Sequence, residues 1–235
     1  VSWSAAGNYS VELITTSATG CKDTTTQVVT VVNCVSGDSV MFTTCSQTGK
    51  DGPNQSDCNS AYGGNPTVTI FGNGIQEWTV PSGICGPFTI KAYGAQGGGG
   101  NGGLGAYTEG TFSFNPGDVI RILVGQRGTQ NGNGAGGGGG TFVMQKGSGA
   151  LSADVILMIA GGGGGSTSSS FANRNASAGQ NGLSSQGGQA GGTGGNGGAA
   201  NGGDGGSGGG GRSGNGTPYT GGSQSHGGFS YNNGG

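Results

Sequence analysis

Residues 191–211, GGTGGNGGAANGGDGGSGGGG, form the most unusual stretch of this sequence. Within it the triplet Gly-Gly-x repeats in two runs separated by a slip in register. The residues at x are Thr193, Asn196 and Ala199 in the first run, then Asn201, Asp204 and Ser207 in the second. Collagen also has a period of three but needs abundant proline, so this is not a collagen sequence. The period favours a left-handed extended helix with three residues per turn, called polyglycine II.

Such a helix has no internal hydrogen bonds, so its N–H and C=O groups must find partners on neighbouring helices. Residues 161–235 contain 31 glycines. Ordering them costs on the order of 15–30 kcal/mol more than ordering as many alanines, at about 0.5–1 kcal/mol each. One satisfied hydrogen bond per glycine, at about 0.5–1.5 kcal/mol, offsets roughly that amount. We therefore expect a bundle only if a rigid β scaffold holds the ends of the helices. The alternative is a flexible glycine- and serine-rich linker.

The composition excludes several classes of protein. The chain has 235 residues, of which 63 are glycine and only 8% are charged, and its net charge is −2. Disordered segments are usually highly charged, so disorder does not follow from low hydrophobicity alone. We expect no nucleic-acid partner, because no basic patch is present. The longest apolar run, Val155–Ala160, is too short to span a bilayer, so we expect no membrane-spanning segment.

Runs outside the glycine tracts have the alternation and the β-branched content of strands. These runs are residues 8–15, 26–32, 74–80, 88–93, 106–114, 119–125, 141–146 and 155–160. Between two of them NPGD, residues 115–118, places Pro and Gly as a type II turn requires. Short strands with short turns predict an all-β sandwich. Glycine-rich segments at 97–103, 128–140 and 161–235 are inserted between or after its strands.

Five cysteines are scattered through this strand-like sequence: Cys21, Cys34, Cys45, Cys58 and Cys85. None forms a C-x-x-C pair, and the chain has a single histidine, His226, so we expect no metal site. Disulfides in an oxidising compartment explain the cysteines better, which predicts an extracellular location. The odd number is expected if the chain is a piece of a longer protein that holds one partner.

The N-terminal residues 1–33 resemble the last two strands of Ig-like domains of the polycystic-kidney-disease type. The resemblance lies in the pattern W…GNYSVEL…GCKDTTTQVVTVV. Such domains are common as tandem modules in bacterial surface proteins. The resemblance implies that an Ig-like domain ends at residue 33 and that Cys21 pairs with a cysteine upstream of this chain.

Residues 34–235 are expected to form a second domain. The block FTTCSQTGKDGPNQSDCNSAY (Phe42–Tyr62) is followed in order by GIQEWTVP, FTIKAYGAQGG, ILVGQRG, GGGGGTFVM and VILMIAGGGGG. This series resembles the glycine-rich extracellular domain of anaplastic lymphoma kinase and leukocyte tyrosine kinase, and similar blocks occur in bacterial secreted proteins. The resemblance implies a TNF-like β-sandwich with inserted polyglycine II helices. It also implies a disulfide between Cys45 and Cys58. Cys34 and Cys85 do not match the family and remain as a second candidate pair. The family's closing strand is missing, so we expect truncation after Gly235.

Catalytic and nucleotide-binding motifs are weak. GNGGLG (Gly100–Gly105) fits the dinucleotide pattern but precedes a strand, whereas that pattern must open a helix. TCSQTGKD lacks the first glycine of a phosphate-binding loop, because Thr44 stands there, and Asp51 replaces its Ser/Thr. His226 stands alone in a Gly/Ser tract, and the carboxylates are dispersed without a pair suited to acid–base catalysis. We expect neither a cofactor nor enzymatic activity.

These features favour an adhesive or structural module of a large secreted surface protein, whose partner is a protein or a glycan at the cell exterior. By analogy, the combination of modules resembles bacterial adhesins exported by the type IX pathway of gliding bacteria, which adds the secretion machinery as a partner. A receptor ectodomain and a phage-tail adhesin tip are the alternatives. The tail aromatics Tyr219, Phe229 and Tyr231 are expected to pack between glycine helices, the alternative being exposed contacts for a partner.

Overall fold

The chain is all-β, as the sequence predicts. The computed structural model describes residues 5, 7–31, 39–84, 86–131, 134–165, 175–177, 181–183, 190–199, 208–217 and 228–233. Within them, the helical elements are α1 (Gln55–Tyr62) and the single 3-10 turns η1 (Leu151–Ala153) and η2 (Tyr231–Asn233). All other regular elements in this part of the chain are antiparallel strands.

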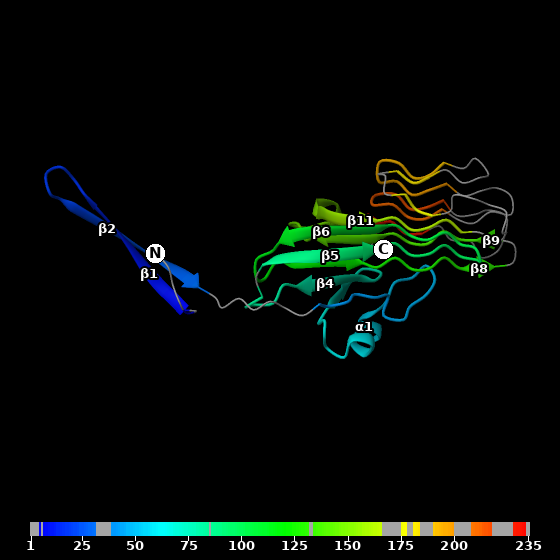
Figure 1. Cartoon of the computed structure of the whole chain (residues 1–235), viewed down its shortest axis with the longest axis horizontal. Coiled ribbons are helices and arrows are strands. Elements are labelled where there is room, and N and C mark those ends of the chain that lie inside the picture. The colour runs from blue at the N-terminus through cyan, green and yellow to red at the C-terminus, as the bar shows by residue number, and fades with distance from the viewer. Residues whose placement is uncertain are drawn as a thin grey trace.

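Two sheets form the body of the molecule (Figure 1). The larger has five strands in the order β11 (Val155–Ala160), β10 (Thr141–Gln145), β7 (Val119–Leu123), β4 (Ile75–Thr79) and β3 (Thr69–Phe71). The smaller pairs β5 (Pro87–Tyr93) with β6 (Tyr107–Ser113), and a very short hairpin pairs β8 (Gln130–Asn131) with β9 (Gly134–Ala135). All the predicted strands are present; β3, β8 and β9 were not predicted.

The predicted turn at residues 115–118 joins β6 to β7. Gly117 has a φ of 90°, and the N–H of Asp118 donates to the carbonyl oxygen of Asn115 at 3.0 Å. A positive φ at the third position is the requirement of a type II turn, which explains the glycine there.

The core between the two sheets follows from strand periodicity. Ile120 and Ile122 of β7 are buried against Ala92 of β5, while Met158 and Val143 extend the same cluster along β11 and β10. The aromatic side chains Trp78, Phe88 and Phe112 pack against it. Because alternate residues of a strand face opposite sides, the residues between them point to the other face of the five-stranded sheet.

That other face has a smaller core of its own. Ile75, Phe142 and Met144 are buried there together with Leu151 of η1 and Tyr231 of η2. The rings of Phe142 and Tyr231 stack with centroids 5.7 Å apart. The five-stranded sheet is therefore covered on both faces, on one side by β5–β6 and on the other by the end of the glycine-rich tail.

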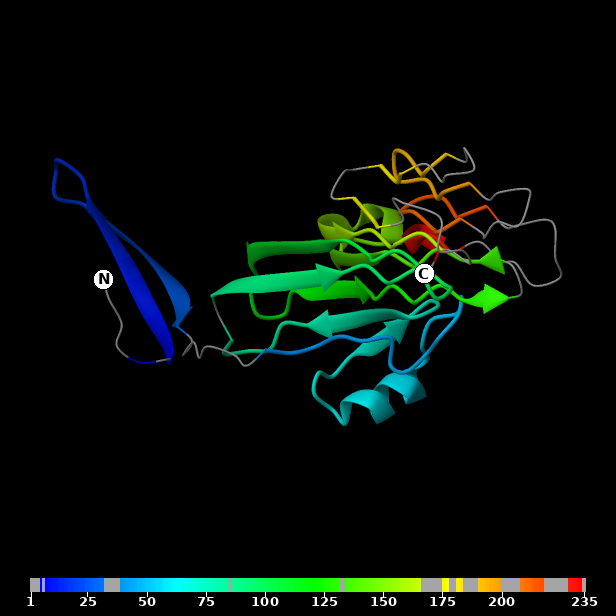
Figure 2. The ribbon, with the colours of Figure 1, turned by 45° about the vertical axis from the view of Figure 1, so that its right-hand side comes forward.

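The N-terminal strands β1 (Gly7–Thr16) and β2 (Lys22–Val31) form a ten-pair antiparallel hairpin. Figures 1 and 2 show that it stands apart from the two packed sheets. One of its faces collects apolar side chains from both strands, which are Tyr9, Val11, Leu13, Val29 and Val31. The Ig-like assignment and the boundary at residue 33 stay predictions, since residues 32–38 lie outside the described part of the chain.

Helix α1 was not predicted, although its start signal is present in the sequence. Asn54 caps it by accepting a hydrogen bond from the N–H of Asp57, whose side chain accepts from the N–H of Asn54 in return. This reciprocal capping satisfies two of the donors that a helix start leaves free. Gly63, with a φ of 57°, ends the helix in a left-handed conformation that glycine adopts without strain.

Candidate functional site: a glycine bundle and an exposed tyrosine pair

Five glycine-rich segments continue the strands of both sheets. We number them I (94–98), II (102–106), III (125–129), IV (136–140) and V (161–165). Segments I, III and V follow β5, β7 and β11, and segments II and IV lead into β6 and β10. In Figure 1 they run side by side from the right-hand ends of the strands. Together they are called the glycine bundle below.

Hydrogen bonding in the bundle has a period of three residues. In segment I, the N–H groups of Gly94 and Gly97 donate to segment II at 2.8 and 2.9 Å. The N–H groups of Ala95 and Gly98, one residue further along, donate to segment IV at 2.9 and 2.8 Å. Residues three apart thus face the same neighbour, and successive residues face different neighbours. A β-strand, with its period of two, cannot bond neighbours in this way.

The bundle joins the two sheets directly. Packed sheets lie about 10 Å apart because side chains fill the space between them. Beyond the strands, however, the N–H of Gly163 in segment V donates to Ala95 of segment I at 2.9 Å. The N–H groups of Gly103 and Ala106 in segment II donate to segment V at 2.8 Å. Beyond the strands, the backbone that continues the five-stranded sheet therefore bonds directly to the backbone that continues β5 and β6, and the segments form one bundle.

This approach requires glycine at defined positions. A Cβ atom added to Gly97 would lie 2.0 Å from the carbonyl oxygen of Gly164, and one added to Gly138 would lie 2.2 Å from that of Ala95. At Gly136 the nearest atom to an added Cβ would be 3.7 Å away, an ordinary van der Waals contact. Close backbone contacts therefore require glycine at positions 97 and 138 but not at position 136.

The predicted insertions at 97–103, 128–140 and 161–235 coincide only in part with the bundle, which already begins at residues 94 and 125. In the tail, residues 190–199, 208–217 and 228–233 bond one another in a similar way. Examples are the N–H of Gly198 to Gly209 and the N–H of Gly216 to Gly228, at 3.0 and 2.9 Å. Apart from these residues and 161–165, 175–177 and 181–183, the predicted tail lies outside the described part of the chain.

A buried ionic network anchors this tail to the five-stranded sheet. Arg121 of β7, with 2% of its side chain exposed, binds Glu77 of β4 at 2.8 Å and Asp154 at 3.0 Å. Asp154 also accepts hydrogen bonds from the hydroxyl of Tyr231 at 2.6 Å and from the N–H of Gly147 at 2.8 Å. Glu77 and Asp154 are far apart in the sequence, but the fold brings both onto one guanidinium.

The network shifts the ionisation of its members. Burial acts to raise the pKa of Glu77, but hydrogen bonds from Lys146 and Arg121 outweigh it and hold the pKa below its usual value. Burial, followed by the hydrogen bond to Asp154, raises the pKa of Tyr231 well above that of an exposed tyrosine. Both shifts favour the ionisation states that hold the network together at neutral pH.

Two of the three tail aromatics lie among the described residues. Tyr231 is fully buried, but it packs against Phe142 of the sheet and not between glycine segments, which corrects the expected location. Phe229 is half-buried, and the ammonium of Lys50 lies 5.6 Å from the centre of its ring. Tyr219 lies outside the described part of the chain.

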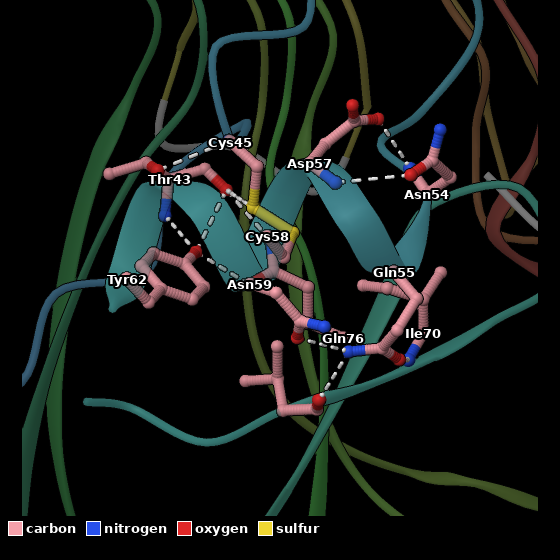
Figure 3. Close-up of a disulfide and its surroundings, with 11 residues drawn as sticks. Thr43, Cys45, Asn54, Gln55, Asp57, Cys58, Asn59, Tyr62, Ile70 and Gln76 are labelled. Atoms are coloured by element: carbon pink, nitrogen blue, oxygen red, sulfur yellow. Dashed lines mark hydrogen bonds between the residues drawn. A yellow bond between two sulfur atoms is a disulfide. The ribbon is translucent and has the colours of Figure 1, made fainter. Parts of the chain in front are cut away.

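A disulfide joins Cys45 and Cys58, the pair that the family resemblance implies (Figure 3). Both residues are buried, and the bond fastens α1 to the segment before it. Beside it, the hydroxyl of Tyr62 donates to Gln76 at 2.6 Å, and the side-chain amide of Gln76 donates to the carbonyl oxygen of Thr43 at 2.7 Å. Helix, disulfide and β4 thus form one cross-linked cap at the side of the sandwich.

The remaining predicted positions form no second site in the described structure. Cys21 is an exposed free thiol, whereas Cys34, Cys85 and His226 lie outside the described residues. Gly100–Gly105 leads into strand β6, not into a helix. No group of three or more His, Cys, Asp or Glu that could hold a metal occurs among the described residues.

An exposed tyrosine pair lies where β5 and β6 enter the bundle. Tyr93 and Tyr107 are directly opposite each other in the register, with ring centroids 4.9 Å apart, and they are 64% and 46% exposed. The hydroxyl of Tyr107 donates to Glu109, which raises the pKa of Tyr107 to about 12. Leu104 of segment II, three residues before β6 begins, is also exposed. Neither tyrosine was predicted as a site residue.

Comparisons with known proteins agree with part of the family resemblance. No protein-family model matches the chain. The leukocyte tyrosine kinase receptor of Mus musculus is 36% identical over 98 residues, covering 37% of this chain and 11% of the receptor. The resemblance to that receptor is confirmed over this part. In the described part of the chain, no helix has the length and apolar character needed to cross a membrane.

Proposed function

We propose that this chain is an extracellular, non-enzymatic adhesive module that displays a rigid glycine bundle on a small TNF-like sandwich. The observation that carries the proposal is the period-three hydrogen bonding of segments I–V, which ties both sheets together beyond their strands. A linker has no need of such bonding. A glycine- and serine-rich linker that only spaces other domains behaves as a flexible coil.

The proposal takes the segments to be polyglycine II helices. Three residues per turn would direct successive N–H groups to different neighbours about one third of a turn apart. The bonds of Gly94 and Gly97 to one neighbour, and of Ala95 and Gly98 to another, support this conformation. Face-to-face packing of two antiparallel sheets supports the TNF-like part of the proposal.

Two observations favour the cell exterior. The buried Cys45–Cys58 disulfide requires an oxidising environment to form and persist. A receptor is similar to part of the chain.

The displayed bundle carries almost no charge, since Arg127 is the single charged residue in segments I–V. Such a surface attracts neither nucleic acid nor anionic lipid.

A non-enzymatic role is part of the proposal. The carboxylates that the fold brings together are already paired, Glu77 with Arg121 and Lys146, and Asp154 with Arg121 and the Tyr231 hydroxyl. A general acid or base needs a carboxyl group that can reach a substrate. The buried pairing in the network favours a structural role for these groups.

A second candidate function is a ligand-binding ectodomain of a receptor. The similarity to the mouse leukocyte tyrosine kinase receptor favours it. Because the chain covers only 11% of that receptor, ligand binding there transfers to this chain only as a proposal.

The adhesive function can be tested in two steps. First, an epitope inserted after Ala18, in the exposed turn between β1 and β2, should be stained on intact cells that produce the full-length protein. Second, beads coated with the chain should adhere to those cells. Beads carrying Gly136→Ala should adhere equally, while Gly138→Ala, which disrupts the bundle, should abolish adhesion. Staining only after permeabilisation, or equal adhesion by both variants, would contradict the proposal.

A further inference from the structure

The outer face of the β5–β6 sheet is the surface with the clearest chemical pattern. Cross-strand pairs on it are Pro87 with Ser113, Thr89 with Thr111, Lys91 with Glu109, and Tyr93 with Tyr107. All eight residues are exposed. Apart from Pro87, the first three pairs are thus polar or charged, and the face ends in two adjacent aromatic rings beside the glycine bundle.

Stability alone gives a partial reason for the tyrosine pair. A cross-strand aromatic pair stabilises a two-stranded sheet. That contribution comes from contact between the rings, yet the pair leaves 64% of Tyr93 and 46% of Tyr107 open to solvent. The two rings are tilted by 39° to each other, and each keeps part of its surface open to solvent.

The two charged residues next to the tyrosines have opposite sign. Lys91 lies directly opposite Glu109 in the register, and Glu109 also accepts a hydrogen bond from the hydroxyl of Tyr107. An ionic partner would therefore meet a charge of its own sign as well as one of the opposite sign. A neutral partner would instead meet the two rings and, two pairs further along the face, the hydroxyl groups of Thr89 and Thr111.

We propose that Tyr93 and Tyr107 form a stacking platform for a neutral hexose oligosaccharide. The size of the platform favours such a ligand over a protein. A fully buried aromatic side chain contributes about 150–250 Å², so two partly exposed rings offer far less than the roughly 800 Å² per partner of a stable protein interface. A sugar ring with equatorial hydroxyls has an apolar C–H face that can stack on a tyrosine, and further units of an oligosaccharide can extend along the face toward the threonines.

The inference rests on the proposed adhesive function and is tested by titration. Cellohexaose, laminarihexaose and β-1,4-galactohexaose are added separately to the chain labelled with ¹³C in its tyrosine rings. We expect at least one of them to shift the Tyr93 and Tyr107 resonances with a Kd of about 0.1–1 mM. Tyr93→Ala and Tyr107→Ala should weaken binding about tenfold or more, measured by calorimetry.

Two matched variants separate stacking from folding. Tyr93→Phe/Tyr107→Phe keeps both rings and should bind within about twofold of the unaltered chain. Leu13→Ala, on the exposed remote hairpin, should leave binding unchanged. The platform is overturned if none of the three sugars shifts the two resonances, if the alanine variants bind as well as the unaltered chain, or if dextran sulfate binds more tightly than all three.

Bead adhesion distinguishes the two proposals. If beads carrying Tyr93→Ala/Tyr107→Ala adhere to producing cells as well as unaltered beads, the platform is wrong while the adhesive function stands. If unaltered beads fail to adhere although an oligosaccharide binds the tyrosines in solution, the adhesive function is wrong while the platform stands.

Discussion

The hydroxyl of Tyr231 donates a hydrogen bond to Asp154 at 2.6 Å, across 77 positions of the sequence. Asp154 stands just before β11 and is bound by Arg121 of the central strand β7. Arg212, also in the tail, donates to the carbonyl oxygen of Asp154 at 2.9 Å. The end of the glycine-rich tail is therefore held on the sheet by a buried polar network, and this network makes the tail part of the fold.

Replacing Tyr231 by phenylalanine should loosen this attachment. The ring can still stack on Phe142, but buried Asp154 loses one of its donors. We expect the free energy of unfolding to fall by about 1–3 kcal/mol, measured by urea denaturation. Tyr107→Phe is the control, because its hydroxyl bond lies on the exposed face and its loss should change stability little. Equal stability of Tyr231→Phe and the unaltered chain would contradict the anchoring role.

Alkaline pH should weaken the same attachment. The pKa of Tyr231 is raised in the folded protein, whereas an unfolded tyrosine ionises near pH 10. The stability that this group contributes is therefore fully present below about pH 10 and is lost as the pH rises from there toward the folded pKa. Unfolding midpoints measured from pH 8 to 11.5 should fall steeply in the unaltered chain and less steeply in Tyr231→Phe. Parallel curves would show that Tyr231 does not titrate as inferred.

The glycine bundle predicts opposite outcomes for two neighbouring substitutions. Gly138→Ala forces a methyl group to within 2.2 Å of the oxygen of Ala95 and should destabilise the chain by about 1–3 kcal/mol or more. Gly136→Ala has 3.7 Å of room and should be neutral or stabilising by up to about 1 kcal/mol, because alanine restricts the unfolded chain. The midpoints of thermal unfolding of the two variants measure this difference in stability. A similar effect at the two positions would argue against close backbone packing.

Removing the Cys45–Cys58 disulfide should cost about 3 kcal/mol, since the bond closes a loop over a separation of 13 residues. Cys45→Ala/Cys58→Ala should show this loss in denaturant, together with faster amide exchange in α1. Cys21→Ser removes an exposed free thiol and should behave as the unaltered chain does. A double variant as stable as that control would mean that the cap contributes nothing to folding.

Much of the β framework could be predicted because its signals are local. Alternation along the strands and the Pro-Gly turn at residues 115–118 depend on a few adjacent residues, and the structure confirms both. Helix α1 was equally local but was missed, although Asn54 and Asp57 carry its capping pattern. The spacing of the glycines in GAQGG and GQRG, residues 94–98 and 125–128, is another local signal. These glycines recur every third residue, as the bonding in the bundle does.

The contacts that organise the site could not be predicted in this way. Glu77 lies beside Arg121 because β4 pairs with β7. Asp154 reaches the same guanidinium from the residue directly before β11. Neither contact can be predicted from residues that are adjacent in the sequence. The same holds for Tyr93 and Tyr107, whose adjacency depends on the register of β5 with β6. The charged and aromatic residues could be identified from the sequence. Which of them contact one another depends on how the strands pair.

Amide hydrogen exchange of the glycine bundle, read by NMR at single residues, is the decisive experiment. If backbones of the two sheets bond each other, the N–H groups of Gly98, Gly103 and Gly163 should exchange as slowly as those in the centre of β7. If the three glycines instead exchange at the rate of an unstructured peptide while β7 stays protected, the segments are flexible loops and the display function falls with the bundle.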